Sequence, residues 1–218
     1  MFEAAKIQAM LAVAPVPLKA MILLGINCGF GNTDVANLRI KNLDLKDGWC
    51  NYPRPKTGIP RRCPLWPETV KAIRAARKAR SEPQDRADAD LVFLTPNGQR
   101  WVWTRGNIAD IDATDIERVA HVSRADRVTD AIAQLVSKLG LVRRGHTFYS
   151  LRHTFEAIGG ESRDQVAVDA IMGHSRDDMA SVYRERISDD RLRAVVEHVR
   201  KWLLKKPLQR ISRRIKKD

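Results

Sequence analysis

Four polar side chains in this sequence have the types and the order that cleavage of a phosphodiester strand would need. They are Lys56, Arg152, His174 and Tyr183, and Tyr183 follows His174 by nine residues and Arg152 by thirty-one. A tyrosine hydroxyl is a poor nucleophile at neutral pH because its pKa is about 10. It becomes useful when cations surround it and the target is a phosphate. Each residue alone has an ordinary explanation, as a packed tyrosine, a solvated cation or a helix-end histidine, so the prediction depends on the four together.

The four side chains suit different parts of such a reaction. The planar guanidinium of Arg152 matches two phosphate oxygens and stays charged at any relevant pH. His174 follows a glycine, which predicts a helix break from which the imidazole could bond a phosphate oxygen. Lys56 lies in the turn sequence PKTG and could protonate a leaving oxygen. Attack by Tyr183 would leave a covalent phosphotyrosine, which keeps the bond energy and lets the strand be rejoined without ATP.

The charge of the chain predicts a polyanionic partner. Its 218 residues carry 39 Lys and Arg against 26 Asp and Glu, which gives a formal net charge of +13 and a pI near 10.1. Nucleic acid is the first candidate and an anionic membrane surface is the second. A basic protein without either partner is the alternative, since charge informs on association and not on fold.

Cysteine usage and hydropathy predict a cytoplasmic, nucleoid-associated protein. Cys28, Cys50 and Cys63 form neither a CxxC pair nor a zinc-ligand spacing, and their odd number argues against a disulfide framework. The first residues lack the basic-then-apolar order of a signal peptide. The longest apolar run is too short to cross a bilayer, so we expect no membrane association through a spanning helix.

Apolar periodicity predicts a mainly helical chain with one small sheet. Alternating residues separated by turns predict three antiparallel strands at 43–45, 49–52 and 59–65. Residues 81–90 are expected to be a polar linker, 92–94 and 101–103 a short hairpin, and 104–125 a candidate insertion. Helices are expected at 3–12, 17–28, 33–39, 67–80, 126–139, 149–158, 162–172, 177–186 and 189–205.

Four segments of the chain resemble the catalytic domain of the tyrosine recombinases, also called phage-type integrases. LLGINCGFGNTDVANLRIKNLDL is similar to the first motif of that domain, and PRPKTGIPRRCPL is similar to its β-hairpin lysine motif. TFYSLRHTFEAIGG resembles its second box, and IMGHSRDDMASVYRERI resembles its nucleophile box. The resemblance covers nearly the whole chain, from residue 16 to about residue 200. It implies an α+β, mainly α-helical fold, in which the tyrosine-recombinase catalytic core carries a small three-stranded antiparallel β-sheet on one edge.

The resemblance also implies a role for each candidate residue. Lys56 would be the general acid, Arg152 the second catalytic arginine, His174 the third-box residue and Tyr183 the nucleophile, with His153 as a supporting companion of Arg152. The implied activity is cleavage and rejoining of duplex DNA, in site-specific recombination or integration, through a 3′-phosphotyrosyl intermediate. It would involve further protomers on paired DNA sites and neither a metal nor a small-molecule cofactor. The source would be a prokaryote, a phage or another mobile element.

The same resemblance divides the chain into a catalytic domain over 1–206 and a basic C-terminal tail over 207–218. The tail would be either a nucleic-acid arm or a disordered, solubilising segment. The N-terminal core-binding domain of the family is expected to be absent, so DNA affinity would be weaker and strongly dependent on salt. The apolar face of helix 189–205 would either pack within its own domain or dock onto a neighbouring protomer.

Two positions depart from the family pattern. Gly31 stands where the first catalytic arginine is expected, and Tyr149 stands where a histidine is expected three residues before Arg152. By analogy with a lost oxyanion donor, the missing arginine would cost roughly 10²–10³-fold in rate. Tyr149 can donate one hydrogen bond, but it is a poor base at neutral pH.

Three explanations of these departures remain open. Another cation fills the gap, or the enzyme is slow and needs a partner, or the domain has lost catalysis and only binds DNA. The candidates for the missing cation are His146 and four arginines: Arg39, Arg54, Arg61 and Arg62. We also expect these four arginines, together with Arg176, to contact DNA. A type IB topoisomerase is less favoured because its additional domains are lacking, and an RNA-binding protein because its aromatic motifs are.

Overall fold

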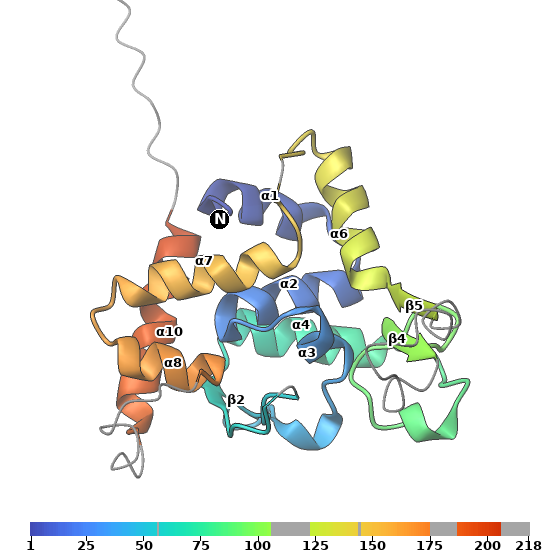
Figure 1. Cartoon of the computed structure of the whole chain (residues 1–218), viewed down its shortest axis with the longest axis horizontal. Helices are drawn as coiled ribbons and strands as arrows, with labels where there is room; N and C mark the ends of the chain where they lie inside the picture. The colour runs from blue at the N-terminus through green and yellow to red at the C-terminus, as the bar shows by residue number, and fades with distance from the viewer. Residues whose placement is uncertain (56, 106–122, 144, 175–186, 206–218) are drawn as a thin grey trace, which may run out of the picture.

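A helix that is buried on every side over most of its length lies at the centre of the fold. In the computed structural model, which describes residues 1–55, 57–105, 123–143, 145–174 and 187–205, all of the residues from Ala20 to Cys28 of α2 (Val16–Cys28) are buried. The helices α4 (Pro67–Lys78) and α7 (Tyr149–Gly160) pack along α2 (Figure 1). A helix without a polar face has to be enclosed by other elements, so α2 organises the domain around itself.

The remaining elements surround this helix. In chain order they are α1 (Ala4–Val13), α3 (Asn32–Ala36) and the 3₁₀ turn η1 (Ile40–Asn42), then β1 (Leu43–Asp44), β2 (Trp49–Asn51), β3 (Arg62–Pro64), the 3₁₀ turn η2 (Arg86–Asp88), β4 (Val102–Arg105), β5 (Ser123–Asp126), α6 (Arg127–Lys138), α8 (Gln165–Met172) and α10 (Asp189–Leu204). Among the described helices, none combines the length and the apolar character that a bilayer crossing requires. The order of these helices and strands confirms the mainly helical α+β fold expected from the sequence.

The predicted three-stranded antiparallel sheet is present, in the order β1-β2-β3. Cys50 on β2 lies opposite Leu43 on one side and Cys63 on the other. The strands are shorter than predicted because prolines supply no N–H group to the pairing, and three of them lie in the connection between β2 and β3.

Backbone hydrogen bonds continue the β2–β3 pairing beyond the strands as far as a tight turn. Tyr52 N donates to Arg61 O (3.1 Å), and Arg54 N donates to Ile59 O (2.8 Å). Gly58 closes the turn with a φ of +70°, which a residue with a side chain rarely adopts. We call residues 52–61 the β2–β3 hairpin.

The expected pairing of 92–94 with 101–103 is wrong. β4 instead pairs with β5, with Trp103 opposite Ala125, while Leu91 bridges Arg39. Residues 92–94 are all buried, whereas a half-exposed strand would bury every second residue. Periodicity cannot distinguish such a short apolar run from an irregular core segment.

Residues 81–90 are more ordered than the predicted polar linker. They contain η2, and the carboxylate of Asp88 is buried and accepts a hydrogen bond from Arg100 Nε (2.7 Å). The predicted helix at 162–172 begins later, at Gln165, because Asp164 caps it by accepting from Ala167 N (3.1 Å). Most of the candidate insertion, the predicted helix at 177–186 and the tail at 207–218 lie outside the described residues.

The apolar face of α10 packs within its own domain. Leu192, Val195, Val199 and their apolar neighbours on this helix are buried in the core. Arg200 reinforces the packing by pairing with Glu68 at the start of α4, at 2.7 Å. Self-packing, one of the two explanations offered for this face, is therefore confirmed for these residues.

Asn27 joins the C-terminal end of α2 to the start of α4. Its side chain is fully buried, and its Nδ2 donates to Pro64 O (3.0 Å). Its Oδ1 accepts from Trp66 N (2.8 Å) and from the hydroxyl of Thr69 (2.9 Å). This asparagine therefore fixes the segment that connects β3 to α4.

We expect Asn27→Leu to lower the free energy of unfolding by about 2–4 kcal/mol, because the backbone N–H of Trp66 and the hydroxyl of Thr69 would stay buried without their acceptor. Urea unfolding would measure the loss. The control is Asn42→Ala, which removes an exposed bond to Asn51 O and should cost no more than about 0.5 kcal/mol. Equal losses in the two variants would contradict the role given to Asn27.

Candidate active site

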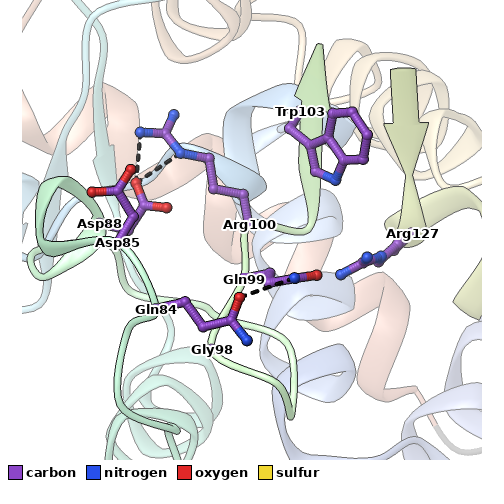
Figure 2. Close-up of a pocket in the computed structure, with 8 residues that line it drawn as sticks. All are labelled: Gln84, Asp85, Asp88, Gly98, Gln99, Arg100, Trp103 and Arg127. Atoms are coloured by element: carbon purple, nitrogen blue, oxygen red, sulfur yellow. Dashed lines mark hydrogen bonds and ion pairs between the residues drawn. The ribbon is translucent and has the colours of Figure 1, made fainter. Parts of the chain in front are cut away.

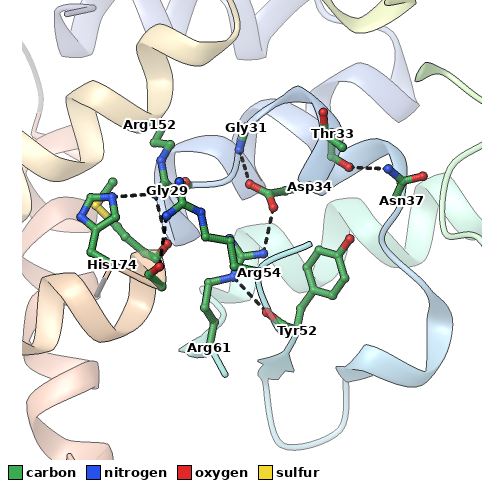
Figure 3. A network of polar contacts seen from close by, with 12 residues as sticks. Gly29, Gly31, Thr33, Asp34, Asn37, Tyr52, Arg54, Arg61, Arg152 and His174 are labelled. Atoms are coloured by element: carbon green, nitrogen blue, oxygen red, sulfur yellow. Dashed lines mark hydrogen bonds and ion pairs between the residues drawn. The ribbon is translucent and has the colours of Figure 1, made fainter. Parts of the chain in front are cut away.

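Arg152 lies where the C-terminal ends of α2 and α8 meet. Its side chain extends from the first turn of α7, and the residue is only 3% exposed. Nη1 donates to Gly29 O at 2.5 Å, and Nη2 donates to Met172 O at 3.1 Å (Figure 3). Carbonyls at helix C-termini lack a partner within the helix and carry partial negative charge. The guanidinium therefore supplies the missing bonds of two helices and holds their ends together.

His174 extends this arrangement. Its Nε2 lies 2.8 Å from Nη2 of Arg152. Because arginine has no acceptor, Nε2 must accept this bond, so the ring proton lies on Nδ1. Nδ1 faces Asp169 Oδ1 (3.7 Å) and Glu156 Oε1 (3.9 Å). Burial, and then the charge of Arg152, lower the pKa of His174, so the ring is neutral at pH 7.

Two left-handed glycines end the helices that Arg152 joins. Gly29 and Gly173 have φ values of +63° and +65°. A Cβ on Gly173 would lie 2.7 Å from Cδ of Arg61 and 3.2 Å from Cβ of Arg54. Glycine is required here because the β2–β3 hairpin crosses directly over the end of α8.

That crossing brings two hairpin arginines beside Arg152 and His174. Arg54 Nη1 donates to Gly173 O at 3.2 Å. Arg61 is buried, with Nη2 bonded to Asp34 Oδ1 and Nε to the carbonyl of Tyr52, both at 2.9 Å. Burial is the main cause that lowers the pKa of Arg152, and the charges of both hairpin arginines lower it further.

The two positions that depart from the family pattern are in contact with each other. A Cβ on Gly31 would lie 3.3 Å from Cδ2 and Cε2 of Tyr149, so the tyrosine ring occupies the direction that a side chain at 31 would take. Beside them is a cavity of about 540 Å³, which we call the hairpin cavity. It is lined by Gly31, Asn32, Thr33, Asp34, Arg54, Pro55, Asp126 and Tyr149.

The other predicted site residues lie apart from this group or outside the described structure. Arg39 pairs with Asp90, and Arg62 pairs with Asp189. Arg62 also stacks on Trp49, and His146 lies against Phe2. Exposed His153 forms a T-shaped ring contact with Tyr149, and its Nδ1 lies 3.9 Å from Glu156 Oε2. Lys56, Arg176 and Tyr183 are not among the described residues. Their roles in DNA contact or catalysis stay predictions.

Sequence reasoning did not identify the partner of Arg61. The Oδ2 atom of Asp34 accepts from Gly31 N (2.8 Å), while its Oδ1 atom pairs with Arg61. The spacing of an acidic residue three positions after a helix start predicts the first bond. Nothing local predicts the second, because Arg61 is 27 residues away along the chain.

A second cavity, of about 380 Å³, lies between η2 and the start of α6 (Figure 2). Its shape is maintained by the pairing of Asp88 with Arg100 and by a bond from Gln99 Nε2 to Gln84 Oε1 at 3.0 Å. It contains none of the residues predicted to do chemistry. Within the described part of the chain, no three His, Cys, Asp or Glu side chains gather as metal ligands would. The hairpin cavity, with arginines beside it, is suited to an oxyanion.

Comparison with known proteins identified a matching family and several solved structures with a similar fold. The model of the Phage integrase family matches residues 1–188. The integrase from mycobacterium phage Brujita is similar in structure, with a TM-score of 0.60 and 20% identity, over 90% of this chain and 56% of that chain. The Tn1549 transposon integrase in complex with circular intermediate DNA has a TM-score of 0.57 and 18% identity, over 89% of this chain and 65% of that chain.

The XerA recombinase is a third similar structure, with a TM-score of 0.53 and 22% identity, over 90% of this chain and 63% of that chain. The chain thus spans less than two thirds of each of these solved chains. Comparison with curated proteins found no match. At such identities the structural likeness shows a shared fold.

We expect Gly173→Ala to destabilise the protein more than Gly140→Ala. Both glycines have φ near +65°, so each variant should lose about 1 kcal/mol for left-handed backbone. A Cβ at Gly140 meets nothing within 4 Å, whereas one at Gly173 would collide with Arg61, which should add about 1–3 kcal/mol. Urea unfolding of both variants measures the difference. Equal losses would show that the hairpin does not press on the end of α8.

The neutral state of His174 should make the stability depend on pH. Its pKa is lowered on folding, so the unfolded chain binds the proton more readily. The contribution is complete above the unfolded pKa of about 6.5 and is lost as pH falls through the folded value. The difference in free energy of unfolding between wild type and His174→Gln should therefore shrink from about pH 8 to about pH 5. A difference that stays constant or grows on acidification would contradict this assignment.

Proposed function

The chain belongs to the phage integrase family of tyrosine recombinases, and we propose on that basis that it cleaves and rejoins strands of duplex DNA in site-specific recombination or integration. The observation that carries the proposal is the convergence of Arg152, His174 and Arg54 at the ends of α2 and α8 (Figure 3). Such a cluster of guanidinium groups is suited to the charge that builds on phosphate oxygens during attack. The net charge of +13 favours association with a polyanion.

In the proposed reaction the hydroxyl of Tyr183 attacks the phosphorus. A bond forms between the tyrosine oxygen and phosphorus, and the bond to the 5′ oxygen breaks. The phenol gives up its proton to solvent water, Lys56 protonates the leaving 5′ oxygen, and a 3′-phosphotyrosyl intermediate results. Attack by a 5′ hydroxyl reverses these changes and rejoins a strand. Further protomers on paired sites would allow strands from two duplexes to be exchanged.

Arg152 is prepared for this task before any substrate binds. Of its five N–H groups, three are engaged by Gly29, Met172 and His174, which leaves two without a partner among the described residues. Those two are available to a non-bridging phosphate oxygen. Since the guanidinium is already fixed and desolvated, it needs little reorganisation when the charge develops.

A second candidate function is binding of duplex DNA without catalysis. The contact between Gly31 and Tyr149 favours it, because the tyrosine ring stands where an arginine from position 31 would extend. The cluster around Arg152 would then bind a phosphate of intact DNA and fix the position of the protein on the duplex.

A covalent adduct distinguishes the two functions. We expect the protein to trap itself on a pool of nicked duplexes of random sequence, since loss of the short fragment beyond the nick prevents rejoining. Label at the 5′ end of the cleaved strand should remain on the protein if the linkage is 3′-phosphotyrosyl. The adduct should disappear in Tyr183→Phe and persist in Tyr52→Phe, the matched loss of a hydroxyl elsewhere in the chain.

The recovered adducts would also be sequenced to identify a preferred duplex. Should no adduct form at any salt concentration while duplex binding persists, the non-catalytic function would replace the proposed one. An adduct that survives in Tyr183→Phe would show that another group is the nucleophile.

A further inference from the structure

The carboxylates of the hairpin cavity are already engaged by neighbouring groups. Asp34 pairs with Arg61. Asp126 accepts from Thr129 N and from Asn32 Nδ2, both at 3.0 Å. Asp34 is therefore paired with a cation already, and Asp126 is held by two neutral donors without forming an ion pair with Arg54 among the described residues.

Arg54 is the arginine that lines the hairpin cavity, and it has no carboxylate partner among the described residues. It lines the cavity and is half-buried, and its guanidinium donates to Gly173 O at 3.2 Å. No carboxylate pairs with it among the residues that the structure describes. Its charge also acts on Arg152 and His174, since it lowers the pKa of both. Cations held together in a partly buried site repel each other unless an anion offsets their charge.

The backbone holds Arg54 in place. Its N–H donates to Ile59 O (2.8 Å), and its carbonyl accepts from Thr57 N (3.1 Å) and Gly58 N (2.8 Å). Arg54 is thus the base of the tight turn of the hairpin, and its contact with Gly173 ties that turn to the end of α8. Because both the backbone and the guanidinium of Arg54 are held by hydrogen bonds, its remaining N–H groups point in a defined direction.

Arg61, the other arginine of the hairpin, is not open to the cavity. Its side chain is 1% exposed, its charge is matched by Asp34, and its guanidinium lies over the ring of Phe30 at 4.6 Å. It serves to position the strand that carries it. Of the two arginines that the hairpin brings here, Arg54 is the one open to the cavity.

We infer that Arg54 binds the phosphate that enters the hairpin cavity and supplies the positive charge that position 31 does not. The identity of this phosphate as the phosphodiester to be cleaved rests on the proposed function. The forked guanidinium suits two phosphate oxygens, and Arg54 lines the cavity together with Gly31 and Tyr149. Arg54 is then a catalytic residue of this chain.

The test compares Arg54→Met and Arg54→Lys with a matched control. Arg74→Met also removes an arginine that donates to one backbone carbonyl, Leu45 O at 2.8 Å, on an exposed surface. On the duplex recovered from the adduct pool, Arg54→Met should form adduct roughly 10²–10³-fold more slowly, with Arg54→Lys in between and Arg74→Met unchanged. Urea unfolding confirms that each variant is folded.

Two further readouts separate a phosphate contact from a structural role. Replacing the scissile phosphate by a neutral methylphosphonate should reduce the defect of Arg54→Met, because an anionic oxygen is no longer there to be neutralised. Titration with inorganic phosphate, followed by NMR of arginine Nε–H groups, should show affinity reduced by roughly tenfold or more in Arg54→Met. A defect that is equal on both substrates would mean that Arg54 acts only through Gly173, and would overturn the inference.

Failure of the inference and failure of the proposed function give different results. If the wild type forms adduct and Arg54→Met forms it equally fast, the inference is wrong and the function stands. If no variant forms adduct but phosphate affinity falls in Arg54→Met and not in Arg74→Met, the phosphate site stands and the cleavage function fails.

Discussion

The buried guanidinium of Arg152 is the interaction on which the rest of the site depends. Removing a cation from water is unfavourable, and burial lowers the pKa of this group. The opposing contribution comes from carbonyls at the ends of α2 and α8, which would otherwise lack partners. Two helices distant in sequence are thereby fixed end to end around one charge. His174 follows directly from the second of them, so its position is a consequence of the same contact.

Close approach of the backbone is the second constraint. Gly29 ends α2 where a Cβ would lie 2.9 Å from the ring of Phe155, and Gly173 ends α8 where the hairpin crosses. Both positions combine a left-handed backbone with no room for a side chain, so each excludes every residue other than glycine for two independent reasons. The crossing at Gly173 places Arg54 beside Arg152, although the two are far apart along the chain.

The relation between Gly31 and Tyr149 suggests how a cation site can be rearranged without loss of the fold. The aromatic ring fills the direction left by the missing side chain, so the pair is complementary in shape and not merely two unrelated losses. A phosphate responds to the charge and hydrogen-bond donors around it, and not to the element that carries them. A guanidinium from the hairpin can therefore stand in for one from the loop before α3, provided that it reaches the same cavity. The likeness to solved integrases shows the shared fold, while the part given to Arg54 is our proposal for the present chain.

The sequence by itself determined the mainly helical fold and the small antiparallel sheet, because helix and strand periods are local patterns. The family motifs named Arg152 and His174 as site residues, and the structure showed the bond between them. It could not identify which of Arg39, Arg54, Arg61 and the other candidates replaces the cation missing at position 31, because nothing in their local sequence distinguishes them. Only the tertiary structure distinguished them, by giving Arg39 and Arg61 carboxylate partners and leaving Arg54 at the hairpin cavity. The same limit explains the wrong pairing predicted for residues 92–94. Which groups meet is decided by burial and by contacts between distant segments, and a local pattern carries no record of either.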